Sequence, residues 1–224
     1  MKIALLLGVL VTLMAGASGP TPESAAWLQV DWEREKFEKG IPTDTIYIHH
    51  TSRPSGITLP ELSELHKGRL YLPRYTGPFN DPVVQGQEPH SGHYRLTGGK
   101  LQEIFWAYHW LIRTDGTPVQ LLTDDEVGWH SGGWGENMRS IAICLDGDFS
   151  SQPPPPAMIE AAGKLVAEYA HTLPITRLRA HYDVKRTTEC PGPWFDASIG
   201  GLTGRDRILK AAGLHLQREQ EGGK

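Results

Sequence analysis

The chain has few cysteines, no excess of basic residues and no apolar run long enough to span a membrane comfortably. Its 224 residues carry 22 Lys and Arg against 26 Asp and Glu, a formal net charge of −4. This balance gives no indication of nucleic-acid binding. Only two cysteines are present, so no framework of disulfides holds the chain together. The hydrophobic content of 39% is instead typical of a globular protein held by its core.

The first residues have the pattern of a secretory signal. Lys2 supplies a positive charge, residues 3–14 are apolar but short for a membrane span, and Ala15-Gly-Ala17 resembles a cleavage site. An uncleaved membrane anchor is the alternative. We therefore expect a signal peptide at 1–17 and an exported protein, in the periplasm or outside the cell. No stable membrane insertion is expected after the signal is removed.

The rest of the chain is predicted to form an arm, one domain and a tail. Residues 18–44 are an N-terminal arm with aromatic residues among charges, 45–213 are the domain, and 214–224 are a polar tail. Within the domain, residues 70–104 carry proline, glycine and aromatic residues without a clear period. A stretch of this kind inside a domain indicates a functional or flexible insertion.

Hydrophobic periodicity predicts strands mixed with helices. Strands are expected at 45–48, 105–113, 118–122, 140–145 and 175–180. Helices are expected near 59–69, after the proline run 153–156, and near 204–213. The first of these helices follows a capping-box pattern at Thr58-Leu-Pro-Glu61. The strand at 140–145 is apolar almost throughout, which is typical of a central strand.

One short stretch places an imidazole and a thiol close together, from His181 to Cys190-Pro-Gly. Both groups suit Zn²⁺, and a third ligand is expected from His49-His50 at the end of the first strand. The two imidazoles point to opposite faces there, so we expect only one to face the site. Three protein ligands leave one tetrahedral position open, as in catalytic zinc sites. A structural histidine and an inert buried cysteine are the alternatives.

The second cysteine, Cys144, lies in the apolar run 140–145 and is expected in the core. A disulfide between Cys144 and Cys190 is the alternative. If Cys144 is a core residue, Cys190 is left for a metal.

These residues, in this order, resemble the type-2 N-acetylmuramoyl-L-alanine amidase family, which includes phage lysozyme-type amidases and peptidoglycan recognition proteins. The resemblance extends from about Thr45 to Phe195. It rests on the motifs Ile-His49-His50-Thr, Ala-Tyr108-His109-Trp-Leu-Ile-Arg-Thr-Asp-Gly-Thr, Gly-Trp-His130-Ser with Asn137 and Ser140-Ile-Ala-Ile-Cys, and His181-Tyr-Asp-Val with Thr188-Glu-Cys190-Pro-Gly.

The resemblance implies a mixed α/β fold, with a central mixed β-sheet flanked by helices. It also implies a zinc site in a surface groove at the strand ends. The ligands would be His49, His181 and Cys190, with His50 as a neighbour that does not bind the metal. The loop between His181 and Cys190 is one residue longer than is common in the family.

The resemblance also implies further site residues. Tyr108 matches the family's catalytic tyrosine, and Thr188 matches a catalytic position two residues before the cysteine ligand. His130 matches a histidine of the substrate groove, and Trp129 and Asn137 beside it are expected to bind substrate. Packing or bracing inside the protein is the alternative for Tyr108, His130 and Trp129.

The function implied is zinc-dependent hydrolysis of the amide bond between N-acetylmuramic acid and L-alanine in peptidoglycan. Zinc-activated water would attack the carbonyl, and Tyr108 would stabilise the oxyanion. The expected partner is peptidoglycan, with no nucleic acid, and the protein is expected to be a monomer. A non-catalytic peptidoglycan-binding module of the same fold and a zinc peptidase that cuts the stem peptide are the alternatives. The presence of all three ligands and the tyrosine favours the amidase.

Overall fold

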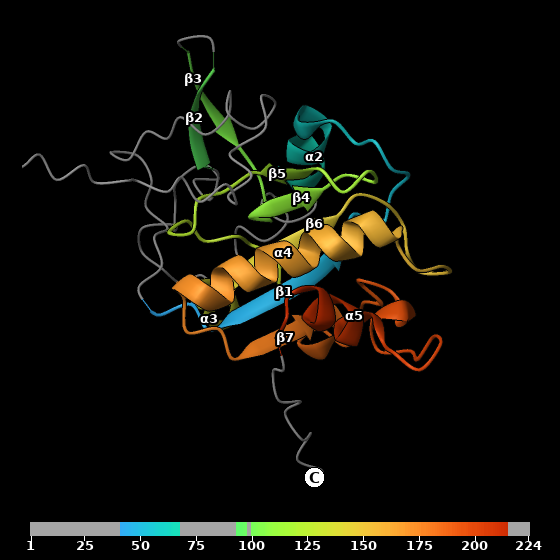
Figure 1. Cartoon of the computed structure of the whole chain (residues 1–224). Helices are drawn as coiled ribbons and strands as arrows, with labels where there is room; N and C mark the ends of the chain where they lie inside the picture. Colours follow the sequence, from blue (N-terminus) through green and yellow to red (C-terminus); the bar gives the residue numbers. More distant parts are fainter. Residues whose placement is uncertain (1–40, 68–92, 98–99, 215–224) are drawn as a thin grey trace, which may run out of the picture.

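The computed structural model of the protein describes residues 41–67, 93–97 and 100–214. The expected signal peptide and nearly all of the arm and tail lie outside these residues. The described part is built on a five-stranded sheet whose strands lie in the order β5-β4-β6-β1-β7 (Figure 1). The strands are β1 (Thr45–His50), β4 (Trp110–Ile112), β5 (Pro118–Gln120), β6 (Ser140–Leu145) and β7 (Arg177–Ala180).

The sheet is mixed, as predicted. β1 runs parallel to both of its neighbours, β6 and β7, and β6 runs parallel to β4. Only the edge strand β5 is antiparallel to its neighbour β4 among these pairs. Every residue of β1 and β6 is buried, which explains why β6 is apolar at every position after Ser140.

Helices cover both faces of the sheet. On one face, α4 (Pro156–Thr172) and α5 (Gly204–Ala211) pack with Ile46 and Ile48 of β1 in the larger core cluster (Figure 1). On the other face, α2 (Leu59–His66) buries its leucines against Leu111 and nearby residues. Because side chains alternate along a strand, Tyr47 and His49 point to the α2 face. None of the described helices has the length and apolarity to cross a bilayer.

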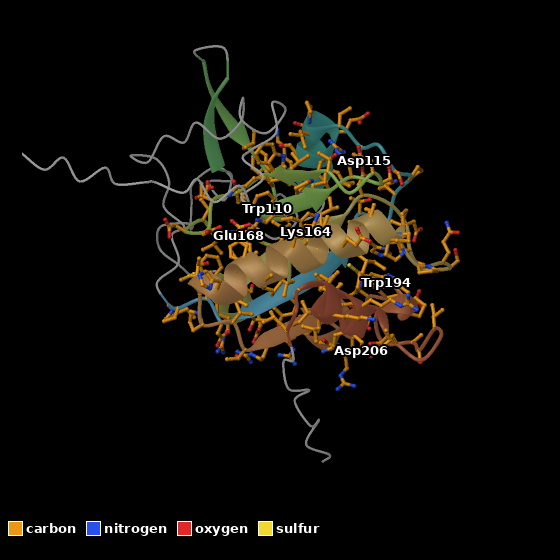
Figure 2. All side chains as sticks on the ribbon, viewed as in Figure 1. Trp110, Asp115, Lys164, Glu168, Trp194 and Asp206 are labelled. Atoms are coloured by element: carbon orange, nitrogen blue, oxygen red, sulfur yellow. The ribbon has the colours of Figure 1, made fainter. Side chains whose placement is uncertain are left out.

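Helix α4 has an apolar side and a polar side. Met158, Leu165 and Val166 are buried against the sheet. Lys164 and Glu168 lie on the exposed side of the helix (Figure 2). The short helices α3 (Trp134–Met138), η3 (His181–Asp183) and η4 (Pro193–Phe195) occur in the connections.

The predicted strand at 105–113 is wrong in its first half. Only Trp110–Ile112 pair in the sheet, as β4. In the preceding segment, side chains of α2 bind the backbone in place of a neighbouring strand. The Phe105 N–H donates to Ser63 Oγ and the Ala107 N–H donates to His66 Nδ1. These two N–H groups are therefore satisfied without a strand partner, and residues 105–109 form no strand.

The expected insertion at 70–104 contains an element that the sequence pattern did not predict. β2 (His93–Thr97) and β3 (Lys100–Ile104) form a separate two-stranded antiparallel sheet. Residues 68–92 and 98–99 lie outside the described part. The predicted helix near 59–69 is confirmed with its capping box. Thr58 Oγ1 accepts from the Glu61 N–H, and the Glu61 carboxylate accepts from the Thr58 N–H.

Candidate metal centre

Three side chains of types that can bind a metal meet at the carboxyl ends of two neighbouring parallel strands. His49 lies near the end of β1, His181 directly follows β7 in η3, and Cys190 lies at the end of the next loop. One ligand atom from each of the three lies within 4.8 Å of the others. His49 Nδ1 is 3.6 Å from Cys190 Sγ, and the rings of His49 and His181 are 4.7 Å apart between centroids. The carboxyl end of parallel strands is where such folds commonly place a site.

The neighbouring histidine, His50, points to the opposite face and does not join the cluster. Its Nδ1 accepts from the Phe149 N–H at 3.0 Å, and its Nε2 lies 2.8 Å from Ser52 Oγ. His50 therefore braces the loop after β6. Its backbone contributes to the site in another way, because the His50 N–H donates to Cys190 Sγ at 3.3 Å.

The loop that carries His181 and Cys190 is held by local hydrogen bonds. Asp183 Oδ2 accepts from the Ala180 N–H at 2.8 Å, which fixes the turn at His181. Thr188 Oγ1 accepts from the Cys190 N–H at 3.2 Å. Gly192 has a φ of 108°, and a Cβ there would lie 2.1 Å from the Phe149 carbonyl oxygen. Only glycine fits this close approach, and it lets the loop pack against the segment that His50 holds.

Burial sets the protonation of two ligands. Burial, together with the nearby His181 and His130, holds the pKa of His49 well below its usual value, so the ring is neutral near pH 7. Burial raises the pKa of the Cys190 thiol to about 12, and the N–H of His50 acts in the opposite direction. A metal that binds the sulfur must therefore displace a proton.

The donor set fits a tetrahedral zinc ion with one open position. Two imidazole nitrogens and one sulfur are donors that zinc prefers. With Zn–N of about 2.0 Å and Zn–S of about 2.3 Å, tetrahedral geometry requires an N···S separation of about 3.5 Å. The separation between His49 Nδ1 and Cys190 Sγ is 3.6 Å. This pair of donor atoms thus already has the separation that a shared zinc ion requires, and the third donor, from His181, lies within 4.8 Å of both.

Tyr108 lies beside this cluster. Its ring centroid is 5.1 Å from that of His49 and 5.0 Å from that of His66. His66 is buried and holds the backbone next to Tyr108 by accepting from the Ala107 N–H. The spacing of Leu59, Leu62 and His66 along α2 places all three on one side of the helix and could have predicted this.

The predicted substrate-binding residues lie in and around the loop before α3. His130 is 4% exposed, and its ring centroid lies 4.9 Å from that of His49. Asn137 is 2% exposed, and its Oδ1 accepts from both the N–H and the hydroxyl of Ser131. Trp129 is 7% exposed. The structure thus brings His130 to the metal ligands, while the substrate contacts of these residues stay predictions.

The second cysteine is a core residue, as expected. Cys144 pairs with His49 across β1 and β6, and it is fully buried in the cluster under α2. Cys144 and Cys190 are both free thiols. The sulfur of Cys190 is therefore available to a metal.

Comparison with known sequences gives a family match. The model of the family described as N-acetylmuramoyl-L-alanine amidase matches residues 39–193. Endolysins from Enterobacteria phage K11 and Klebsiella phage KP32 are 33% and 34% identical to this chain over 83 residues. That segment is 35% of this chain and 54% of each endolysin. The chain thus matches about half the length of these curated relatives.

Comparison with solved structures shows the same fold. The endolysin LysCS, an N-acetylmuramoyl-L-alanine amidase from Clostridium intestinale URNW, has a TM-score of 0.55 at 23% identity and covers 80% of this chain and 90% of its own. The Ph2119 endolysin of a Thermus scotoductus MAT2119 bacteriophage has a TM-score of 0.53 at 19% identity, with the same coverage. PGRP-SA of Apis mellifera has a TM-score of 0.51 at 19% identity and covers 74% of this chain and 84% of its own.

Proposed function

The chain belongs to the N-acetylmuramoyl-L-alanine amidase family, and from this premise we propose that it hydrolyses the bond between N-acetylmuramic acid and L-alanine in peptidoglycan. The observation that carries the proposal is the cluster of His49, His181 and Cys190 with Tyr108 beside it. A module that only binds peptidoglycan has no need of this combination. The similarity to phage endolysins supports the same activity.

We assign zinc to the three-residue cluster. Zinc bound there would supply a Lewis acid and would lower the pKa of a coordinated water toward neutrality. His49 presents a neutral ring, and the N–H of His50 stabilises the sulfur of Cys190 as a thiolate. Thr188 and Asp183 keep the loop in the shape that brings His181 and Cys190 to His49.

Tyr108 is the residue we assign to the reacting carbonyl. Its position next to His49 allows the hydroxyl to donate a hydrogen bond to the carbonyl oxygen as negative charge develops on it. His66, Ser63 and the backbone of 105–107 hold the tyrosine in place from the side of α2. A donor that is fixed before the reaction needs no reorganisation during it, which is the source of its effect on rate.

The remaining assignments follow from the same proposal. Thr188 positions substrate or water in addition to holding the loop, and Trp129, His130 and Asn137 form the substrate-binding side of the site. The partner is peptidoglycan, which the protein meets as a monomer in the periplasm or outside the cell. Export would depend on the signal at 1–17.

Product analysis tests the bond that is cut. Purified protein is incubated with peptidoglycan, and the released fragments are identified by mass spectrometry. The proposal predicts stem peptides that begin with a free L-alanine amine. Peptides cut within the stem would indicate the zinc peptidase instead, and wall material that is bound without cleavage would indicate the recognition module.

A further inference from the structure

A chain of hydrogen bonds leads from the metal ligand His49 into the protein interior. His49 Nδ1 faces Cys190 Sγ at 3.6 Å, so the metal side of the ring is Nδ1. The other nitrogen, His49 Nε2, lies 3.0 Å from His130 Nδ1. His130 Nε2 lies 2.9 Å from Ser140 Oγ, and the Ser140 hydroxyl donates to the Glu136 carbonyl oxygen at 2.5 Å. Each of the two rings is thus held at both of its nitrogens.

When a metal is bound, the hydrogen bonds from His49 through His130 to Ser140 can point in only one direction, because each donor must meet an acceptor. A metal on Nδ1 of neutral His49 requires its proton to be on Nε2. That N–H must donate to His130 Nδ1, so the proton of His130 is on its own Nε2. The Nε2–H of His130 then donates to Ser140 Oγ, and the hydroxyl donates to a backbone carbonyl, which can only accept. Both tautomers are assigned from these contacts.

Burial and packing make this series of hydrogen bonds rigid. His49 and Ser140 are fully buried and His130 is 4% exposed, so water does not readily replace a lost partner. The low dielectric of such a site strengthens each hydrogen bond. Ser140 is fixed by its place at the start of β6, which pairs with β1 next to it. The loop carrying His130 is held in turn by Asn137 through Ser131.

We propose that His130 is a positioning residue that, backed by Ser140, fixes the tautomer and ring orientation of the metal ligand His49. Partners of this kind orient the ligand and raise its basicity, and their loss typically weakens metal binding about 10- to 100-fold. The role differs from a substrate contact because it acts on the metal before substrate is present. It rests on the metal site of the proposed function, but not on the reaction.

Ser140→Ala is the most informative variant. The serine is fully buried and bonds the far side of His130, so it touches neither metal nor substrate. His130→Leu removes the acceptor for His49, and His130→Asn offers a side-chain oxygen close to the position of Nδ1. Ser63→Ala is the matched control, since it also removes one buried serine hydroxyl, in this case one in α2 that accepts the Phe105 N–H.

The readout is binding of Co²⁺ to metal-free full-length protein, followed by its visible absorption and by competition with Zn²⁺. We expect Ser140→Ala and His130→Leu to bind Co²⁺ about 10- to 100-fold more weakly. His130→Asn should recover part of the loss, and Ser63→Ala should bind within about twofold of the unaltered protein. Long-range ¹H–¹⁵N spectra of the zinc-loaded protein should show both His49 and His130 protonated at Nε2.

Co²⁺ affinity and spectrum unchanged in folded Ser140→Ala and His130→Leu would overturn the positioning role. A His130→Leu variant that raises only KM for peptidoglycan would do the same and would make His130 a substrate contact. An Nδ1–H proton on His130 would also contradict the proposal. The proposed function is tested separately, because it fails if the unaltered protein binds neither Co²⁺ nor Zn²⁺.

Discussion

At the scale of single residues, the adjacent histidines of β1 show how strand geometry separates chemistry from support. His49 faces the metal site, while His50 points to the other face and holds the Phe149 N–H. The two histidines therefore have different roles, because successive side chains of a strand point to opposite faces of the sheet. The pair provides an internal comparison, since both are buried imidazoles in one strand.

His49→Ala should therefore affect metal binding, and His50→Ala should affect stability. His49→Ala should abolish stoichiometric zinc binding. His50→Ala should retain zinc at saturating metal but lower the free energy of unfolding by about 1–3 kcal/mol, because a buried N–H loses its acceptor. Zinc content and chemical unfolding measure the two effects. Equal loss of zinc in both folded variants would contradict this division of roles.

Tyr108→Phe should separate metal binding from turnover. The variant should keep its zinc and lose about 10²- to 10³-fold in kcat, since one hydrogen-bond donor to the oxyanion is removed. Tyr169→Phe is the control, because its hydroxyl binds Asp124 and Trp110 on the α4 side of the sheet. That control should lose stability and keep its turnover. Full activity in Tyr108→Phe would remove Tyr108 from the mechanism.

The sequence predicted the three residues of the candidate metal cluster but not the residues that support them. His49, His181 and Cys190 stand in motifs whose residue types already suit zinc, and the structure brings them together. His66 and Ser140 act through partners that only the fold brings near. His66 contacts backbone groups, the N–H of Ala107 and the carbonyl oxygen of Phe105, and these leave no mark on the side-chain pattern.

At the scale of elements, local signals were reliable and long-range ones were not. The capping box at Thr58 and the strand at 140–145 were predicted because neighbouring residues determine them. The segment 105–109 contains strand-forming residues, but α2 supplies its hydrogen-bond partners from about forty positions away. No periodicity within the segment can report that contact.

The packing of α4 on α5 depends on one glycine. A Cβ at Gly163 would lie 2.4 Å from the Ala211 Cβ and 3.0 Å from the Ile208 carbonyl oxygen. Gly163→Ala should force the helices apart and lower the free energy of unfolding by about 1–3 kcal/mol. Gly135→Ala in α3 is the control, since a Cβ there meets nothing within 4 Å. Chemical unfolding should show a loss for Gly163→Ala and none for the control, and equal stabilities would refute the packing argument.

One carboxylate, that of Asp44, links the beginnings of the neighbouring strands β1, β6 and β7. Asp44, just before β1, forms ion pairs with Arg139 next to β6 and with Arg177 of β7. Burial alone would raise the pKa of Asp44, but hydrogen bonds from Arg139, Thr45 and Arg177 outweigh it and lower the pKa from 3.8 to about 2. The folded-state pKa is depressed, so the contribution to stability is present above the unfolded value.

Asp44→Asn should lower the free energy of unfolding by about 1–2 kcal/mol near pH 7. The difference between this variant and the unaltered protein should shrink as the pH falls from about 4 toward about 2, where the carboxylate takes up its proton. Urea unfolding at a series of pH values measures it. A difference that stays constant over this range would show that Asp44 does not act through its charge.

At the scale of the whole molecule, the candidate metal site joins distant parts of the chain. Its ligands come from β1 and from the segment after β7, and β1 lies between β6 and β7 in the sheet. The mixed α/β class was predicted correctly, since the motifs that carry the family resemblance are spread from 45 to 195. The β2–β3 hairpin was not predicted, because the composition around it resembles a loop.

Zinc should therefore stabilise the entire domain. Binding to the folded state alone adds about 2.7 kcal/mol when free zinc is 100 times its Kd. Thermal unfolding should shift to lower temperature when a chelator removes the metal, and it should recover when zinc is returned. Cys190→Ala should show no such shift, because one of three ligands is missing. A chelator-independent Tm in the unaltered protein would contradict a metal site that links these segments.

The most direct measurement combines zinc content with cleavage in one sample. Zinc per chain is determined for the purified protein, and peptidoglycan fragments are then analysed before chelation, after chelation and after zinc is restored. The proposed function predicts one zinc per chain, stem peptides with a free L-alanine amine, loss of these products on chelation and their return with zinc. Unchanged release of the same products by zinc-free protein would contradict it.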